Sequence, residues 1–134
     1  MANAGRTVAG FLDAPLTPLG RTQAEEIKPL IAALDERPNL VYHSALSRAR
    51  DTASIVNQAI GCPMHEHPEL AEQNYGDWQG QSWDVIDPFK AEDLDPPNGE
   101  TKNQFYARAV AAVEYCLDHS AQIHRAPMPL IVFR

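Results

Sequence analysis

The stretch that decides the fold is LVYHSALSRARDTA, residues 40–53. Its first residues, Leu40 to Tyr42, form a short apolar run of the kind that makes a buried strand. After His43 the pattern changes to a helical period, so a strand is expected to run directly into a helix. Strands that alternate with helices are typical of α/β proteins with a mainly parallel sheet, whose ligands bind beyond the carboxyl ends of the strands. The stretch therefore predicts both a fold class and the place of a site.

Segments on both sides of this stretch extend the pattern. Thr17 and Pro18 predict a helix start, because a hydroxyl side chain can cap a helix and proline is favoured at its first position. The residues expected on the buried face of that helix are Ile27, Leu30, Ile31 and Leu34. A further helix is expected after residues 98–101, with its buried face made by Phe105, Ala109, Ala112, Val113 and Cys116. Residues 130–133 predict a second buried strand, and residues 64–70 a third extended segment.

The composition narrows the class of protein. The chain has 134 residues, of which 44% are hydrophobic, and this fits one globular domain. Its formal net charge of −7 argues against binding nucleic acid or an anionic membrane surface through bulk charge, and no apolar run is long enough to span a membrane. The sequence opens without a secretory leader, and two cysteines, Cys62 and Cys116, are too few for a disulfide framework. We therefore expect a cytoplasmic protein with no nucleic-acid and no membrane partner.

Arg48 is the candidate anion-binding residue. It lies in the first turn of the predicted helix, where free N–H groups and the positive end of the helix dipole favour an anion. Its planar guanidinium group can bind two phosphate oxygens at once. A basic residue near a helix start is more often simply solvated. The position of Arg48 just beyond the carboxyl end of a strand favours a site instead.

Glu72 is the candidate proton donor. It is followed by Tyr75, Gly76 and Trp78, and a carboxyl group that is partly buried beside such residues suits a general acid. An ordinary surface charge is the alternative, and the residues alone favour it. His65 and His67 could both lie on one face of a strand, but no further ligand completes a set with them, so no metal is expected.

Four motifs stand in an informative order along the chain, at residues 3–24, 44–53, 69–80 and 96–108. Together they resemble the histidine phosphatase superfamily, which includes the cofactor-dependent phosphoglycerate mutases and broad-specificity phosphatases. The first resembles the family's opening loop and helix, and the second its S-x-L-x-R-A-x-x-T-A signature. The third resembles the E-L-x-E-x-x-x-G-x-W-x-G segment. The fourth, PPNGET with an arginine downstream, resembles the P-P-G-G-E-S block of the phosphatase-type members and so favours a phosphatase over a mutase.

The resemblance implies a phosphoglycerate mutase-like fold, a three-layer α/β/α sandwich with a mainly parallel sheet, and a reaction without metal or cofactor. In the family a histidine of an R-H-G motif attacks phosphorus and becomes phosphohistidine, and a carboxylic acid protonates the leaving oxygen. Arginines and a second histidine hold the phosphoryl oxygens. Matched by motif, Glu72 is the proton donor, while Arg48 and Asn3 bind phosphate. The residues expected to line the substrate pocket are Gly10, Tyr75 and Trp78.

The catalytic histidines of the family have no counterpart at the matching positions. The spacing to Asn3 would place the first before Met1, and the second would follow the strand that ends near Val132. We therefore expect residues 1–134 to form a single, incomplete domain without the family's first central strand. The strands ending at His43 and Val132 would then lose a shared neighbour, and each unpaired buried backbone group would cost about 1–3 kcal/mol. The sheet edge left exposed would invite pairing with a second copy in a homodimer.

The predicted function is that of a phosphomonoester hydrolase that acts on a small phosphorylated metabolite through a phosphohistidine intermediate. The expected partner is that phosphorylated substrate or inorganic phosphate. The 134-residue chain itself is expected to be inactive, because it lacks the nucleophilic histidine. The alternative is a non-catalytic module that keeps the anion pocket and binds phosphorylated ligands or a partner protein. Under both hypotheses, residues 73–98 form an insertion that is expected to shape the substrate pocket.

Overall fold

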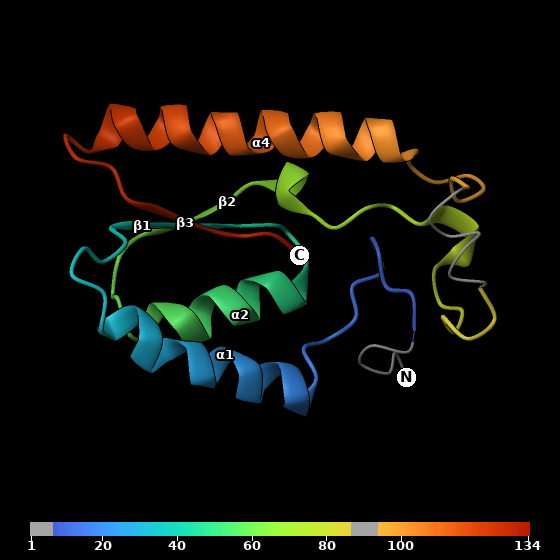
Figure 1. The fold of residues 1–134 in the computed structure, drawn as a ribbon, viewed down its shortest axis with the longest axis horizontal. Helices are drawn as coiled ribbons and strands as arrows, with labels where there is room; N and C mark the ends of the chain where they lie inside the picture. Colours follow the sequence, from blue (N-terminus) through green and yellow to red (C-terminus); the bar gives the residue numbers. More distant parts are fainter. Residues whose placement is uncertain (1–6, 87–93) are drawn as a thin grey trace.

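The computed structural model describes residues 7–86 and 94–134 and has three layers. A parallel sheet is covered on one face by α4 and on the other by α1 and α2 (Figure 1). The strands are β1 (Leu40–His43), β2 (Met64–Glu66) and β3 (Pro129–Val132). The helices are α1 (Pro18–Ala32), α2 (Ser47–Asn57) and α4 (Lys102–Ile123), with the short 3-10 helices η1 (Pro68–Leu70) and η2 (Gly76–Trp78). The predicted α/β/α fold class is confirmed.

β1 is the central strand of a sheet whose order is β2-β1-β3. Tyr42 of β1 pairs with His65 of β2 on one side and with Ile131 of β3 on the other, and both pairings are parallel. The prediction that β1 and β3 would lose a shared neighbour is therefore wrong, because the two strands hydrogen-bond directly to each other and the backbone of β1 is satisfied on both edges. Within the described residues the outer edge of β3 has no strand partner. Pairing of this edge with a second copy stays a prediction.

The start of α1 is the one that the sequence predicts. Thr17 is its N-cap, and the Thr17 hydroxyl oxygen accepts a hydrogen bond of 3.0 Å from the backbone N–H of Gly20. The predicted buried face is wrong except for Ile31, because Leu30 is 68% exposed and Ile27 and Leu34 are also exposed. The buried residues of α1 are instead Gly20, Ala24 and Ile31, and Ala24 and Ile31 pack in one cluster with Ile55 and Val56 of α2.

Two hydrophobic clusters lie on opposite faces of the sheet. On the side of α1 and α2 the cluster consists of Leu16, Ala24, Ile31, Ile55 and Val56. On the side of α4 it consists of Leu40, Tyr42, Leu70, Ala112 and Cys116. The second cluster includes two of the residues predicted for the buried face of α4. Both Cys62 and Cys116 are free thiols.

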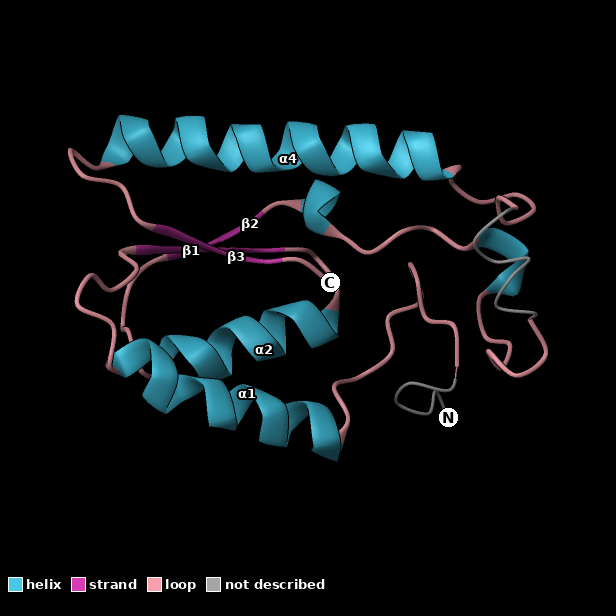
Figure 2. Ribbon diagram, in the orientation of Figure 1, coloured by secondary structure: helices cyan, strands magenta, loops and turns pink. Residues whose placement is uncertain are grey.

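A capping box fixes the start of α4. The Thr101 hydroxyl accepts from the Gln104 N–H at 3.0 Å, and the Gln104 side chain accepts from the Thr101 N–H at 3.0 Å. None of the helices in the described part of the chain is long and apolar enough to cross a membrane. Figure 2 shows that the carboxyl ends of the strands, the loop before α1 and the loop around η2 lie at the same end of the molecule. Asn3 lies outside the described residues.

The packing of α1 predicts opposite outcomes for two neighbouring residues. Ile31→Ala removes a side chain that is 8% exposed and packed in a core cluster, and should lower the free energy of unfolding by about 3 kcal/mol. Leu30→Ala, at a position that is 68% exposed, should change it by less than about 0.5 kcal/mol. Urea denaturation of both variants measures the difference, and equal losses would contradict this packing of α1 on α2.

Candidate active site

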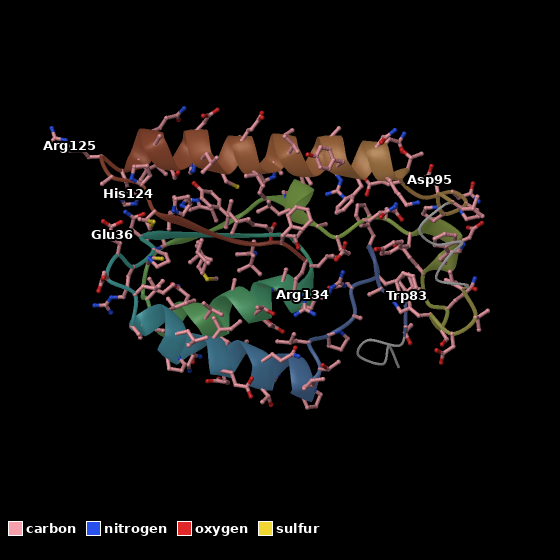
Figure 3. The ribbon with its side chains drawn as sticks, viewed as in Figure 1. Glu36, Trp83, Asp95, His124, Arg125 and Arg134 are labelled. Atoms are coloured by element: carbon pink, nitrogen blue, oxygen red, sulfur yellow. The ribbon has the colours of Figure 1, made fainter. Side chains whose placement is uncertain are left out.

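A cavity of about 440 Å³ opens at the carboxyl end of the sheet. Its walls come from four parts of the chain: residues 7–23, Arg48 of α2, residues 72–83, and Arg134 just after β3. Figure 3 shows Arg134 near the middle of the molecule and Trp83 to its right, with His124 and Arg125 at the far left. The cavity thus lies where the α/β pattern places a ligand site, beyond the carboxyl ends of parallel strands.

Arg48 is the buried cation of this cavity, with an exposed fraction of 7%. Its guanidinium donates to the carbonyl oxygen of Leu12 at 2.7 Å and to that of Gly10 at 2.5 Å. A guanidinium has five N–H donors, so these two bonds do not use all of its capacity. Burial lowers the pKa of Arg48, and the positive charge of Arg134 lowers it further. Arg48 therefore fastens the loop before α1 to α2 and also places positive charge in the cavity.

Arg134 is a second cation of the cavity, and the sequence did not single it out. It lies two residues beyond the end of β3, and its backbone oxygen accepts a hydrogen bond of 2.9 Å from the Ser44 hydroxyl. Its guanidinium lies 3.4 Å from the Thr52 hydroxyl oxygen on α2. The direct pairing of β3 with β1 brings Arg134 close to Arg48, because residues after neighbouring parallel strands meet at one edge. Its position immediately after a predicted strand was the signal that could have found it.

Glu72 lines the same cavity and is half-buried. One of its carboxylate oxygens accepts from the backbone N–H of Gln73 at 3.1 Å. Its negative charge acts on Arg48 in the direction that raises the pKa of Arg48, although burial has the larger, opposite effect. The structure therefore brings the predicted proton donor and the predicted phosphate-binding arginine together at one cavity.

Arg108 of α4 holds the backbone of the segment that carries Glu72. Its guanidinium donates to the carbonyl oxygens of Glu69 at 2.7 Å, Ala71 at 2.9 Å and Glu72 at 3.2 Å. It also forms a two-pronged pair with the Glu100 carboxylate, at 2.8 Å and 2.7 Å. This hydrogen-bonded pair lowers the pKa of Glu100 and raises that of Arg108. Arg108 is thus a positioning residue for Glu72.

The predicted pocket residues divide between two cavities. Gly10 and Tyr75 line the cavity that contains Arg48, and the ring of Tyr75 meets that of Trp83 edge-on, with centroids 5.4 Å apart. Burial raises the pKa of the Tyr75 hydroxyl. Trp78 instead lines a separate cavity of about 320 Å³, and Trp83 lines the cavity that contains Arg48; a place of Trp78 in the substrate pocket stays a prediction. Of the insertion over 73–98, the described part contributes Tyr75 and Trp83 to the site.

Gly10 occupies a position that other residues would fill poorly. Its φ of +53° is in the left-handed region, and a Cβ atom there would meet the Gln73 carbonyl oxygen at 2.9 Å. The side-chain oxygen of Gln79, which accepts from the Phe11 N–H at 2.6 Å, also lies beside it. Gly10 thereby lets the loop pass close enough for its carbonyl group to reach Arg48.

None of the described residues that line the cavity is a histidine. His43, at the end of β1, is buried, and its Nδ1 lies 2.8 Å from the Ser44 carbonyl oxygen. His65 and His119 lie at the interface between the sheet and α4, where Tyr42 and the His119 Nδ1 atom share a 2.7 Å hydrogen bond. Residues 7–86 and 94–134 hold no group of three or more histidine, cysteine or acidic side chains that could bind a metal ion.

Comparison with known proteins shows which family the chain belongs to and which proteins it resembles. The family model described as "Histidine phosphatase superfamily (branch 1)" matches residues 1–126. A glucosyl-3-phosphoglycerate phosphatase of Mycolicibacterium vanbaalenii is 38% identical over 85 residues, which are 63% of this chain and 37% of that protein. A metal-independent phosphoserine phosphatase of Arabidopsis thaliana is 32% identical over 124 residues, covering 84% of this chain and 52% of that one. The chain thus spans about half or less of these relatives.

Solved structures agree with the sequence comparison. A complex of mycobacterial glucosyl-3-phosphoglycerate phosphatase with inorganic phosphate superposes with a TM-score of 0.76 at 28% identity. The match covers 96% of this chain and 68% of that one. The likeness therefore extends over nearly all of the chain, including the segments that form the cavity.

The Arg108–Glu100 pair should contribute measurably to stability, and it should do so in a pH-dependent way. Glu100→Gln leaves a largely buried guanidinium without its carboxylate, and should lower the free energy of unfolding by about 2–3 kcal/mol at neutral pH. Because the pKa of Glu100 is lower in the folded state than in the unfolded chain, its stabilising effect is present above its ordinary pKa and is lost as the pH falls through the folded value.

The matched control is Glu25→Gln, which removes an exposed pair with Lys28 and should cost less than about 1 kcal/mol. Denaturation of the wild type and both variants, at neutral and at acidic pH, measures the two effects. The stability difference between wild type and Glu100→Gln should shrink in acid, and a constant difference would argue against the pair as its source.

Proposed function

Because this chain belongs to the histidine phosphatase superfamily, we propose that it carries the phosphate-binding and proton-donating residues of a phosphomonoesterase that acts on small phosphorylated metabolites. The observation that supports this most is the meeting of Arg48, Arg134 and Glu72 at one cavity. Two guanidinium groups suit the oxygens of a phosphoryl group, and a carboxyl group beside them suits the leaving alcohol. The relatives reported above are named as phosphatases, which favours hydrolysis over mutase activity.

Each residue has a distinct role in the proposed reaction. Arg48 and Arg134 bind the phosphoryl oxygens and stabilise the charge that develops on them as the phosphorus–oxygen ester bond breaks. Glu72 gives its proton to the alcohol oxygen that leaves. In the family's chemistry a histidine nitrogen bonds to phosphorus as that ester bond breaks, and water then hydrolyses the phosphohistidine to inorganic phosphate and the free histidine. Asn3 stays a proposed phosphate ligand by motif alone, because it lies outside the described residues.

A second candidate is a non-catalytic module that binds phosphorylated ligands. The observation that favours it is that no histidine is found among the described residues of the cavity wall. We propose accordingly that the 134-residue chain by itself binds phosphate and its monoesters without hydrolysing them. Binding and turnover are therefore measured separately.

Inorganic phosphate should bind through the two arginines of the cavity. Arg134→Gln should weaken phosphate binding about tenfold, because it removes a charge-assisted contact but leaves the bonds of Arg48 to the loop in place. The matched control is Arg50→Gln, an exposed arginine of the same helix as Arg48 that does not line the cavity. Isothermal titration calorimetry measures the affinities. Equal losses in both variants would show that only bulk charge attracts phosphate, and absence of binding to the wild type would contradict the proposed site.

Turnover separates the hydrolase from the binding module. The 134-residue chain should release no nitrophenol from p-nitrophenyl phosphate above the rate in buffer, because its cavity offers no nucleophilic histidine within the described residues. The decisive comparison is with Glu72→Gln. Phosphatase activity that is present in the purified wild type and lost in this variant would overturn the expected inactivity and establish the chain as a hydrolase.

A further inference from the structure

Asp13 ties the loop before α1 to the start of α2. One of its carboxylate oxygens accepts from the backbone N–H of Ser47 at 2.7 Å, and the other accepts from the Ser47 hydroxyl at 2.9 Å. Leu46, the N-cap residue of α2, makes no capping hydrogen bond with its own side chain. Asp13 therefore supplies, from 34 residues earlier in the chain, the acceptor that a free N–H group at a helix start requires.

The side chain of Asp13 is ionised at neutral pH. The hydrogen bond from the Ser47 N–H lowers its pKa, and the Ser47 hydroxyl and the charges of Arg50 and Arg48 act in the same direction. In return, the charge of Asp13 acts to raise the pKa of Arg48, against the larger effect of burial, which lowers it. The carboxylate is thus close enough to influence this guanidinium, although Asp13 is not among the residues that line the cavity.

The same loop holds the guanidinium group of Arg48. It accepts hydrogen bonds from Arg48 through the carbonyl oxygens of Gly10 and Leu12. Leu12 and Asp13 are neighbours in the loop, just as Arg48 and Ser47 are neighbours at the start of α2. Because the Leu12 carbonyl belongs to the planar peptide unit that joins Leu12 to Asp13, the position of Asp13 also fixes the direction of that carbonyl group.

We infer that Asp13 is a positioning residue for the proposed phosphate site: its two bonds to Ser47 hold the Leu12 carbonyl group where it anchors the guanidinium of Arg48. The inference rests on the proposed function, which places phosphate at Arg48.

This role predicts a change in phosphate affinity opposite to that expected from charge alone. A negative charge near an arginine repels phosphate, so its removal strengthens binding if Asp13 acts only through its charge. If Asp13 acts by position, loss of its bonds weakens binding, because a guanidinium that is free to move loses the fixed geometry of a two-pronged contact.

Two substitutions of Asp13 separate the two effects, because both remove the charge and only one removes the bonds. The amide of Asp13→Asn keeps an oxygen for the Ser47 N–H and offers its NH₂ group to the Ser47 hydroxyl oxygen. Asp13→Ala keeps neither bond, and it should bind inorganic phosphate about fivefold more weakly than Asp13→Asn and also more weakly than the wild type. Isothermal titration calorimetry at neutral pH measures the affinities, and thermal melting shows that each variant is folded at the temperature of the titration.

The matched control is the corresponding pair of substitutions at Asp51, a partly exposed acid of the same helix. Asp51 pairs with Arg21 of α1 at 3.8 Å, and it does not line the cavity. Asp51→Ala and Asp51→Asn should therefore bind phosphate with equal affinity.

Ser47→Ala tests the same bonds from the side of the helix and leaves the charge of Asp13 in place. It removes the 2.9 Å bond and keeps the 2.7 Å bond, so it should weaken phosphate binding about twofold, whereas charge alone predicts no change.

The outcomes separate this inference from the proposed function. If the wild type binds phosphate but Asp13→Ala and Asp13→Asn bind it equally well, or Ser47→Ala binds it as the wild type does, the inference is overturned and the phosphate site stands. If the wild type binds no phosphate, the proposed function is overturned and the inference with it.

Discussion

The guanidinium group of Arg108 is the point on which the geometry of the site depends. It joins α4 to the segment before η2 through a two-pronged bond to Glu100 and through the carbonyl oxygens of Glu69, Ala71 and Glu72. Without it, three backbone oxygens in a partly buried segment would need other donors, and the backbone of Glu72 would lose its anchor. The same residue lies over the rings of Phe11 and Phe105, so it also links this segment to the loop before α1.

Arg48 anchors the loop before α1 in the same way as Arg108 anchors the segment of Glu72, by hydrogen bonds to backbone carbonyl oxygens. Each guanidinium binds carbonyl oxygens of residues that lie outside the sheet and the α-helices, and each stands on an α-helix. The loop before α1 can therefore approach the sheet closely, which Gly10 permits by its positive φ. An arginine with this task remains charged inside the protein, so the fold itself supplies the positive charge that the proposed phosphate site uses.

The sequence predicted local structure better than long-range contacts. Thr17 and Pro18 located the start of α1 because a cap is a local interaction, and the apolar runs located β1 and β3. The buried face of α1 was misjudged because Leu30 has the helical period of a core residue, whereas the small residues Gly20 and Ala24 carry a weaker signal. Motif matching selected Arg48, Gly10, Glu72 and Tyr75, and all four line one cavity in the structure. Arg134 was not singled out and packing was favoured for Trp83, because the places of these residues follow from the strand order and from an irregular segment, which periodicity does not show.

Two parts of the cavity wall are held by different kinds of structure. The arginine end rests on β3 and α2, where strand pairing and helix packing fix Arg134 and Arg48. Leu19 and Trp83 line the same cavity from a helix start and from an irregular segment. Surface positions of this kind tolerate exchange of side chains better than a sheet does. Exchanges at Leu19 or Trp83 can therefore alter this part of the wall while Arg48 and Arg134 keep their places, whereas a change in the packing of β3 against β1 displaces Arg134 relative to Arg48.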